Sequence, residues 1–196
     1  MKIIDATRVC AFLVLALATA AAPADDWQLS ALMRSLAENR SGKATFVEKK
    51  YMQILDQPII ATGELSFVAP DRLEKRTVTP KPETLILDGD VLTIERPGKA
   101  TRTVSLQEHP EVAGFIESIR GTLAGNLSAL KTFYDVTLTG SADNWQLTLK
   151  PRQNRLRSVF DHIAISGSQA EVRSVELEQR DGDHSEMAIT RSRIAR

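Results

Sequence analysis

Apolar residues recur along the chain with two different spacings, and each spacing predicts a different element. Between Asp25 and Gly42 the apolar positions follow a helical period, and Asp25 or Asp26 can cap this helix. From Ala44 onward the period changes to two, which is typical of strands with one buried face. Proline or glycine separates the segments, so we expect antiparallel strands at about 44–55, 59–69, 72–79, 84–88, 91–96 and 101–106.

A second helical region interrupts the strands. Pro110 occupies the first turn of a helix that continues to Gly125 and has one apolar face. Asn126 is suited to cap a further short helix that contains Leu127, Leu130 and Phe133. Strands are expected again at about 134–140, 144–150, 157–166, 171–180 and 185–191.

This order of elements predicts a mainly β fold. Parallel neighbours need a crossover after almost every strand, and three helices among about eleven strands do not supply enough crossovers. One long antiparallel sheet is therefore expected, and a sheet of that size must curl. The helices are expected to cover its concave side, and the chain contains no repeat or linker that indicates a second domain after residue 24.

The N-terminal residues have the pattern of a secretory signal peptide, predicted at 1–24. Lys2 and Arg8 precede the apolar run 9–18, which small residues follow up to Ala24. The run is shorter than the ~20 residues that a membrane-spanning helix needs. Cys10, the single cysteine of the chain, lies in this segment, so the predicted mature domain 25–196 has no thiol for a disulfide or a thiolate metal site.

Charge and histidine content indicate neither nucleic-acid binding nor catalysis. The chain has 25 Lys or Arg and 25 Asp or Glu residues, so it lacks the basic excess that nucleic acid attracts. His109 and His184 adjoin turns or helix ends, and His162 follows Asp161 in a strand, where neighbouring side chains point to opposite faces. The two Asp-Gly-Asp segments, 88–90 and 181–183, lack the rest of a calcium loop and predict turns. We expect no enzyme activity, no cofactor and no metal.

Two glycines make the second helix unusual. Gly114 and Gly121 lie within it, and each costs about 1 kcal/mol of helix stability relative to Ala. Either another group comes close to the helix backbone or the helix is easy to displace, and a removable lid would satisfy both conditions. The alternative is an ordinary core helix that tolerates two glycines.

A series of motifs, taken in order, resembles the periplasmic outer-membrane lipoprotein carrier (LolA-like) family over almost the whole predicted mature chain. The motifs are Phe46 with Glu48, Gly63–Phe67, Pro70–Glu74, Pro80, Pro82, Leu85–Ile94, Val175–Leu177 and Asp181–Asp183. The resemblance implies a half β-barrel, unclosed and covered by helices. It also implies a monomer in the periplasm that takes acylated lipoprotein from an inner-membrane transporter and delivers it to an outer-membrane acceptor.

One position departs from the family pattern. Typical carriers have an arginine before the proline that ends the second strand, and this arginine helps to hold the lid through hydrogen bonds; here Ala69 precedes Pro70. Arg72 is nearby, but we do not assign the role to it. The chain therefore resembles a divergent branch, whose cargo is either lipoprotein or another lipid.

The leading hypothesis is a carrier that binds acyl chains between the sheet and a helical lid. The expected cavity residues are the apolar side chains that alternate along the strands: Phe46, Leu65, Phe67, Leu85, Leu87, Leu92, Ile94, Trp145, Leu147 and Leu149. The expected lid residues are Val112, Phe115, Ile116, Ile119 and Leu123. The alternative hypothesis is a regulatory lipid sensor that binds a membrane signalling protein, although such sensors usually have a second domain for which this chain is too short.

Overall fold

Residues 24–192 are described by a computed structural model, with side chains from Gln28 onward. The helices are α1 (Ala24–Ala37), α2 (Pro110–Leu123), α3 (Leu127–Phe133) and α4 (Asn154–Arg157). The strands are β1 (Ser41–Tyr51), β2 (Ile59–Val68), β3 (Arg72–Thr79), β4 (Glu83–Asp88), β5 (Val91–Glu95), β6 (Arg102–Ser105), β7 (Tyr134–Ser141), β8 (Asn144–Pro151), β9 (Phe160–Ser168), β10 (Glu171–Gln179) and β11 (His184–Arg191). The predicted signal peptide, with Cys10, lies outside the described residues except for Ala24, where α1 begins.

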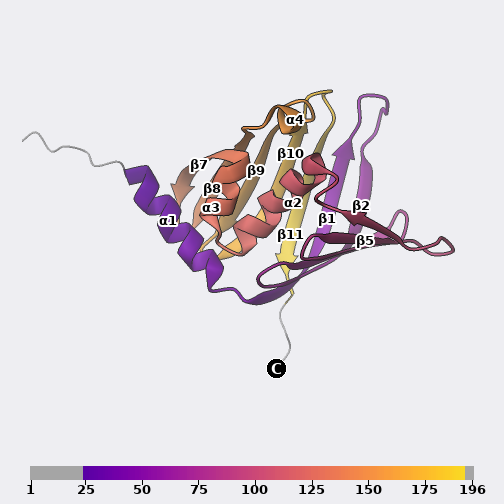
Figure 1. The fold of residues 1–196 in the computed structure, drawn as a ribbon, viewed down its shortest axis with the longest axis horizontal. Coiled ribbons are helices and arrows are strands. Elements are labelled where there is room, and N and C mark those ends of the chain that lie inside the picture. The colour runs from indigo at the N-terminus through magenta and orange to yellow at the C-terminus, as the bar shows by residue number, and fades with distance from the viewer. Residues whose placement is uncertain (1–23, 193–196) are drawn as a thin grey trace, which may run out of the picture.

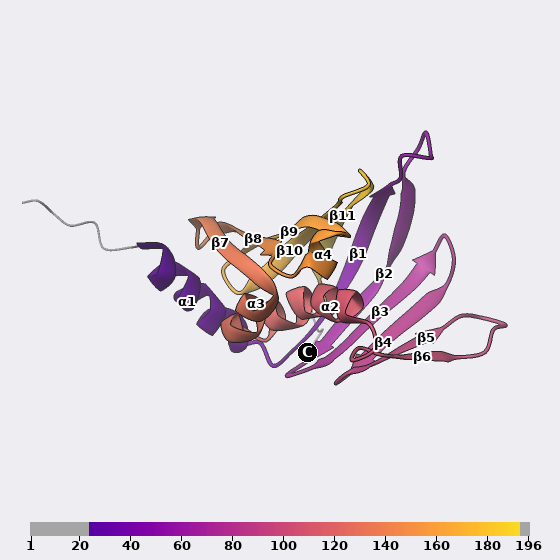
Figure 2. The same ribbon diagram turned by 45° about the horizontal axis from the view of Figure 1, so that its top comes forward.

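All eleven strands belong to one antiparallel sheet with the order β6-β5-β4-β3-β2-β1-β11-β10-β9-β8-β7. Strands β1–β6 form one meander and β7–β11 form another, and the pairing of β1 with β11 joins them. The sheet curls without closing, with β6 and β7 at its two edges (Figures 1 and 2). The predicted fold class, a mainly β protein with an unclosed curled sheet and covering helices, is confirmed.

Turn residues explain much of this order. Gly89 and Gly182 have positive φ values of 56° and 88°, and they lie in the Asp-Gly-Asp turns of the β4–β5 and β10–β11 hairpins. Asn126 caps α3, because its side chain accepts a hydrogen bond from the Ala129 amide at 3.1 Å. The turns and this helix cap agree with the sequence predictions.

Several boundaries and one short helix differ from the sequence predictions. Strand β1 covers 41–51 rather than 44–55, because Ser41 and Gly42 pair with Val68 and Phe67 instead of ending the first helix. The short helix α4 was missed, and β9 consequently begins at Phe160 rather than at about 157. A single turn with one buried apolar residue, Leu156, has no helical period that a sequence pattern can reveal.

One half of the sheet is solidly packed. Helices α1 and α3 lie over β7–β9 (Figure 1), and the side chains between these layers are almost fully buried. Each buried side chain of this size stabilises the fold by about 1.5–3 kcal/mol. The core residues are Leu29, Leu32, Met33, Leu36, Leu130, Tyr134, Trp145, Leu147, Leu149, Ile163 and Ile165.

Helix α2 lies in the angle between the two halves of the sheet (Figure 2), and close neighbours on its back explain its glycines. A Cβ atom at Gly114 would lie 2.5 Å from Leu156 Cδ2 of α4. A Cβ atom at Gly121 would lie 2.9 Å from Leu130 Cδ2 of α3. The first of the two expectations, a close approach to the helix backbone, is therefore correct.

The Gly114 contact yields a stability prediction. Gly114→Ala gains about 1 kcal/mol of helix propensity but forces a clash with the fully buried Leu156, and overpacking of this kind costs about 1–3 kcal/mol. We expect a net loss of about 1 kcal/mol in the free energy of unfolding, measured by urea denaturation. The control is Gly42→Ala, since a Cβ atom at Gly42 meets nothing within 4 Å. Leu156→Ala in the same chain should remove the clash, and strictly additive losses in the double variant would contradict this explanation.

Candidate functional site

The other half of the sheet is hollow. A cavity of about 570 Å³ lies between α2 and the concave face formed by β1–β5 and β9–β11. This volume falls within the range of about 300–1,000 Å³ that is typical of small-molecule sites. Helix α2 turns its apolar side toward the cavity through Val112, Phe115, Ile116, Ile119 and Leu123.

The structure brings many of the predicted site residues together. All five expected lid residues line the cavity, and so do five of the expected sheet residues: Leu65, Phe67, Leu85, Leu87 and Leu92. The others lie elsewhere. Trp145, Leu147 and Leu149 of β8 belong to the packed core, because α1 and α3 fill the inner face of that strand. Phe46, which is 2% exposed, and Ile94 are also outside the lining, and Lys75 Nζ lies over the Phe46 ring.

Several lining residues were not among the predicted ones. They come mainly from the two strands that connect the halves of the sheet, β10 and β11, and from β3. Their alternation along each strand was a usable signal, but only the strand order shows that they face α2. These residues are Leu73, Ile165, Val172, Val175, Leu177, Met187 and Ile189.

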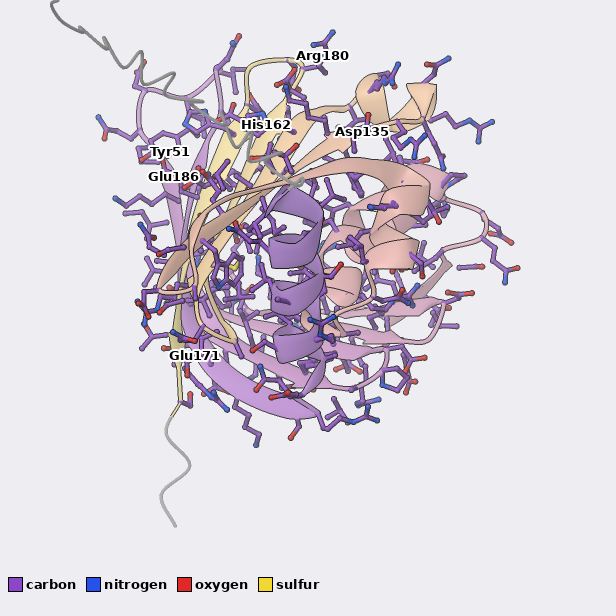
Figure 3. All side chains as sticks on the ribbon, turned by 90° about the vertical axis from the view of Figure 1, so that its left-hand side faces the viewer. Tyr51, Asp135, His162, Glu171, Arg180 and Glu186 are labelled. Carbon is purple, nitrogen blue, oxygen red and sulfur yellow. The ribbon has the colours of Figure 1, made fainter. Side chains whose placement is uncertain are left out.

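The cavity continues into an open groove at one end of the sheet. The ladder between β10 and β11 ends at Ser174 and Ala188, and a bulge between Val172 and Ser174 bends β10 away from β11. The groove has a volume of about 1030 Å³ and shares most of its lining with the cavity. Glu171, which Figure 3 places at this end of the sheet, forms an ion pair of 2.9 Å with Arg191 across the divergence. Because both side chains are about half exposed, this pair stabilises the fold little.

The back of α2 is held by buried polar contacts. The Tyr134 hydroxyl of β7 donates a hydrogen bond of 2.8 Å to the Gly114 carbonyl. Burial raises the pKa of Tyr134 well above its ordinary value, so the hydroxyl keeps its proton and remains a donor. Ser118 is buried beside it and donates to the Phe115 carbonyl, and Thr122, which is buried at the cavity lining, donates to the Ser118 carbonyl of the same helix. The Tyr134 bond therefore holds the back of α2, while the cavity side of the helix is mainly apolar.

Arg120 connects α2 to the tip of the β4–β5 hairpin. Its Nη1 donates to the Gly89 carbonyl at 2.9 Å, and its Nη2 donates to Glu117 Oε2 at 2.7 Å. The Asp90 carboxylate lies 3.7 Å from the same guanidinium. The Glu117 and Arg120 side chains are only 9% and 21% exposed, so this network, the Arg120 anchor, is largely shielded from water.

Residues 18–192 match the family model described as outer membrane lipoprotein carrier protein LolA-like. The chain belongs to this family. It is 23% identical over 177 residues to an outer-membrane lipoprotein carrier protein of Pseudomonas fluorescens, with 90% of this chain and 83% of that protein covered. Among solved structures it is similar to a LolA superfamily protein of Nitrosomonas europaea, with a TM-score of 0.47, 10% identity and coverage of 86% and 95%. It is also similar to the MucA/MucB complex structure of Pseudomonas aeruginosa, with a TM-score of 0.46, 16% identity and coverage of 83% and 55%.

The position of Ala69 distinguishes this LolA-like protein from the pattern expected for the family. Arg72, the nearest arginine, pairs with Asp88 at 2.7 Å, and both side chains are largely exposed. Arg72 therefore does not hold α2. In this LolA-like chain the guanidinium that contacts both the helix and the sheet is that of Arg120, on the helix itself.

The histidines of this LolA-like chain lie away from the cavity lining. Figure 3 places His162 and Arg180 at the end of the sheet opposite Glu171. The expectation that Asp161 cannot contact His162 was wrong: Asp161 Oδ2 lies 3.0 Å from His162 Nδ1, because a bulge in the β9–β10 pairing at Asp161 turns its side chain. The hydrogen bond with His162 lowers the pKa of Asp161. Within residues 24–192, no group of three or more His, Cys, Asp or Glu side chains could hold a metal ion, and no helix is long and apolar enough to cross a membrane.

The Arg120 anchor can be tested by removing its guanidinium. Arg120→Met frees α2 from Gly89 and leaves the buried Glu117 carboxylate unpaired, so we expect a loss on the order of 3 kcal/mol in the free energy of unfolding. The α2 amides should also exchange with deuterium faster. The control is Arg180→Met, whose exposed pair with Asp161 should contribute less than about 1 kcal/mol. Adding Glu117→Gln to Arg120→Met should restore part of the lost free energy of unfolding. Equal losses of stability in Arg120→Met and Arg180→Met would show that the Arg120 anchor does not hold α2.

Proposed function

We propose that this protein is a periplasmic carrier that holds acyl chains in the cavity under α2 and moves them from the inner to the outer membrane. The observation that carries the proposal is a cavity with apolar walls on two sides: apolar side chains of α2 face apolar side chains of the sheet across about 570 Å³. Membership of the LolA-like family supports the same function. The likeness to a lipoprotein carrier of Pseudomonas fluorescens also supports it.

The energetics favour acyl chains as cargo. Burial of one methylene stabilises a complex by about 0.8 kcal/mol, so a chain of ~16 carbons gains on the order of 10 kcal/mol when it leaves water. The same free energy is the cost of exposing the acyl chain to water, so it opposes unassisted passage of the lipid through an aqueous compartment. A protein with a hollow apolar interior lowers this barrier because it replaces water around the chain with Leu, Ile, Val and Phe side chains.

Release requires that α2 can move. Within residues 24–192, the polar contacts that link α2 to other elements are chiefly those of Arg120 and Tyr134. A neutral hydrogen bond stabilises by about 1 kcal/mol and one from a charged donor by about 1.5–3 kcal/mol. Displacement of α2 would open the side of the cavity that this helix covers. Handover then depends on an acceptor whose affinity for the acyl chain is comparable.

The cavity residues allow a direct test. Val175→Phe adds carbon volume where the structure has unfilled space, so stability should change by less than about 1.5 kcal/mol. Affinity for a fluorescent acyl probe should fall at least about tenfold. The control is Val47→Phe on the outer face of β1, where the side chain is 45% exposed, and this variant should bind like the wild type. Delipidated wild-type protein that shows no saturable binding would refute the proposed function, and unchanged binding by Val175→Phe would show that the cavity is not the site.

The protein partner separates the carrier from the sensor hypothesis. For the carrier, we expect an inner-membrane transporter as donor and an outer-membrane acceptor, with the carrier itself monomeric. Chemical cross-linking in native envelopes, followed by mass spectrometry, should therefore identify a transporter. Recovery of an anti-sigma factor instead would favour the regulatory lipid sensor.

A further inference from the structure

Among the described residues, two ion pairs belong to the cavity lining: Glu171 with Arg191 at the open end, where both side chains are about half exposed, and the more buried pair of Glu48 with Lys75. Lys75 Nζ lies 2.5 Å from Glu48 Oε2, and both residues belong to the cavity lining. The two side chains are 27% and 20% exposed, so most of their surface is removed from water. Lys75 Nζ also lies 4.9 Å from the centroid of the Phe46 ring, over the ring face. A charged pair is thus held in the region where the proposed cargo would be bound.

The pair bridges two strands that are not neighbours. Glu48 is on β1 and Lys75 is on β3, while β2 lies between them. Strand β2 presents Gly63 opposite Phe46, and a Cβ atom at Gly63 would lie 2.9 Å from Phe46 Cε1. A side chain at Gly63 would meet the Arg76 carbonyl and the Phe46 ring, and Lys75 Nζ lies over that ring. The ion pair therefore crosses β2 on the inner face of the sheet, beside the Phe46 ring.

Neither stability nor acyl-chain binding explains the pair. Replacement of a buried ion pair by apolar residues of similar size often leaves stability unchanged or raises it. Apolar residues here would also extend the surface that attracts a hydrocarbon chain. An ion pair in this position is better explained by a polar group that the cavity must recognise.

The pair has unused hydrogen-bonding capacity. An ammonium group has three N–H donors, and within residues 24–192 the one protein acceptor of Lys75 Nζ is Glu48 Oε2. A second N–H is directed at most toward the Phe46 ring, which leaves one donor for a ligand. The positive charge is already compensated by Glu48. The site can therefore donate a hydrogen bond to an uncharged acceptor without a net charge of its own.

We propose that Glu48 and Lys75 recognise the uncharged ester or amide linkage of the cargo and discriminate against free fatty acids. This inference rests on the proposed function, because it concerns the polar end of the same acyl ligand. An ester or amide carbonyl accepts the free Lys75 N–H and leaves the ion pair intact. A fatty-acid carboxylate competes with Glu48 for the same ammonium and places two negative charges side by side in a site shielded from water.

The test compares two ligands with the same acyl chain. Delipidated protein is titrated with dodecanoic acid and with monododecanoylglycerol at about pH 8, where the acid is ionised, and each displaces a fluorescent acyl probe. The wild type should bind the ester at least about tenfold more tightly than the acid. Glu48→Gln leaves Lys75 as an unpaired cation and should shift this ratio toward the acid by about tenfold or more.

Two further variants and a matched control complete the experiment. The double variant Glu48→Gln/Lys75→Met should bind both ligands and lose the discrimination, while Lys75→Arg should retain it. The control is Glu64→Gln, which removes the same charge from the exposed pair with Arg76 on the other face of β2 and β3. Its ratio should equal that of the wild type.

The outcomes separate the two proposals. If the wild type binds neither ligand, the proposed function fails, and this inference fails with it. If both ligands bind and Glu48→Gln leaves the ratio as it is in Glu64→Gln, acyl binding stands and the role of the ion pair is refuted. The inference is supported if the ratio of ester to acid affinity shifts in Glu48→Gln and the double variant no longer discriminates between the two ligands. A purely structural ion pair would not change the preference between the ester and the carboxylate head group.

Discussion

The apolar side of α2 and the concave face of the sheet oppose each other across a space that their side chains do not fill. Most of the structure can be understood from this constraint. A helix with an unfilled apolar side gains little from burial on that side, so it must be held from elsewhere. Its back supplies this attachment through close packing at Gly114 and Gly121 and through the hydrogen bonds of Tyr134 and Arg120.

The two halves of the sheet differ in how they are packed. Helices α1 and α3 complete a core over β7–β9, and that core contains the largest fully buried side chains. The half formed by β1–β5, together with β10 and β11, faces the cavity. The densely packed half can stabilise the fold while the other half remains hollow, because all eleven strands are hydrogen-bonded into one continuous sheet from β6 to β7. The packed core and the cavity therefore lie in different regions of one sheet.

Much of the fold was predictable from local patterns. Period-two alternation and glycine turns gave all eleven strands, and Pro110 and Asn126 marked the starts of two helices. Local patterns also identified which residues of α2 and β2 are apolar. They could not show that α1 and α3 fill the space over β8, so Trp145 was expected at the cavity although it belongs to the core. Which helix covers which strand depends on contacts between residues distant in sequence, and alternation contains no information about them.

The same reason explains the polar features that were missed. Asp161 reaches His162 only because a bulge interrupts the β9–β10 pairing. Glu48 and Lys75 lie on β1 and β3, and only the strand order shows that these two strands are on either side of β2, close enough for the side chains to pair. Arg120 contacts a backbone carbonyl of a hairpin, which no pattern of side chains reveals.

The attachment of α2 has one more consequence. The chain has a single cysteine, Cys10, so no disulfide within it can tie the helix to the sheet. Everything that fastens α2 is noncovalent, and such contacts re-form spontaneously once the helix returns. In the proposed carrier, displacement and return of α2 would therefore need no disulfide to be reduced or re-formed.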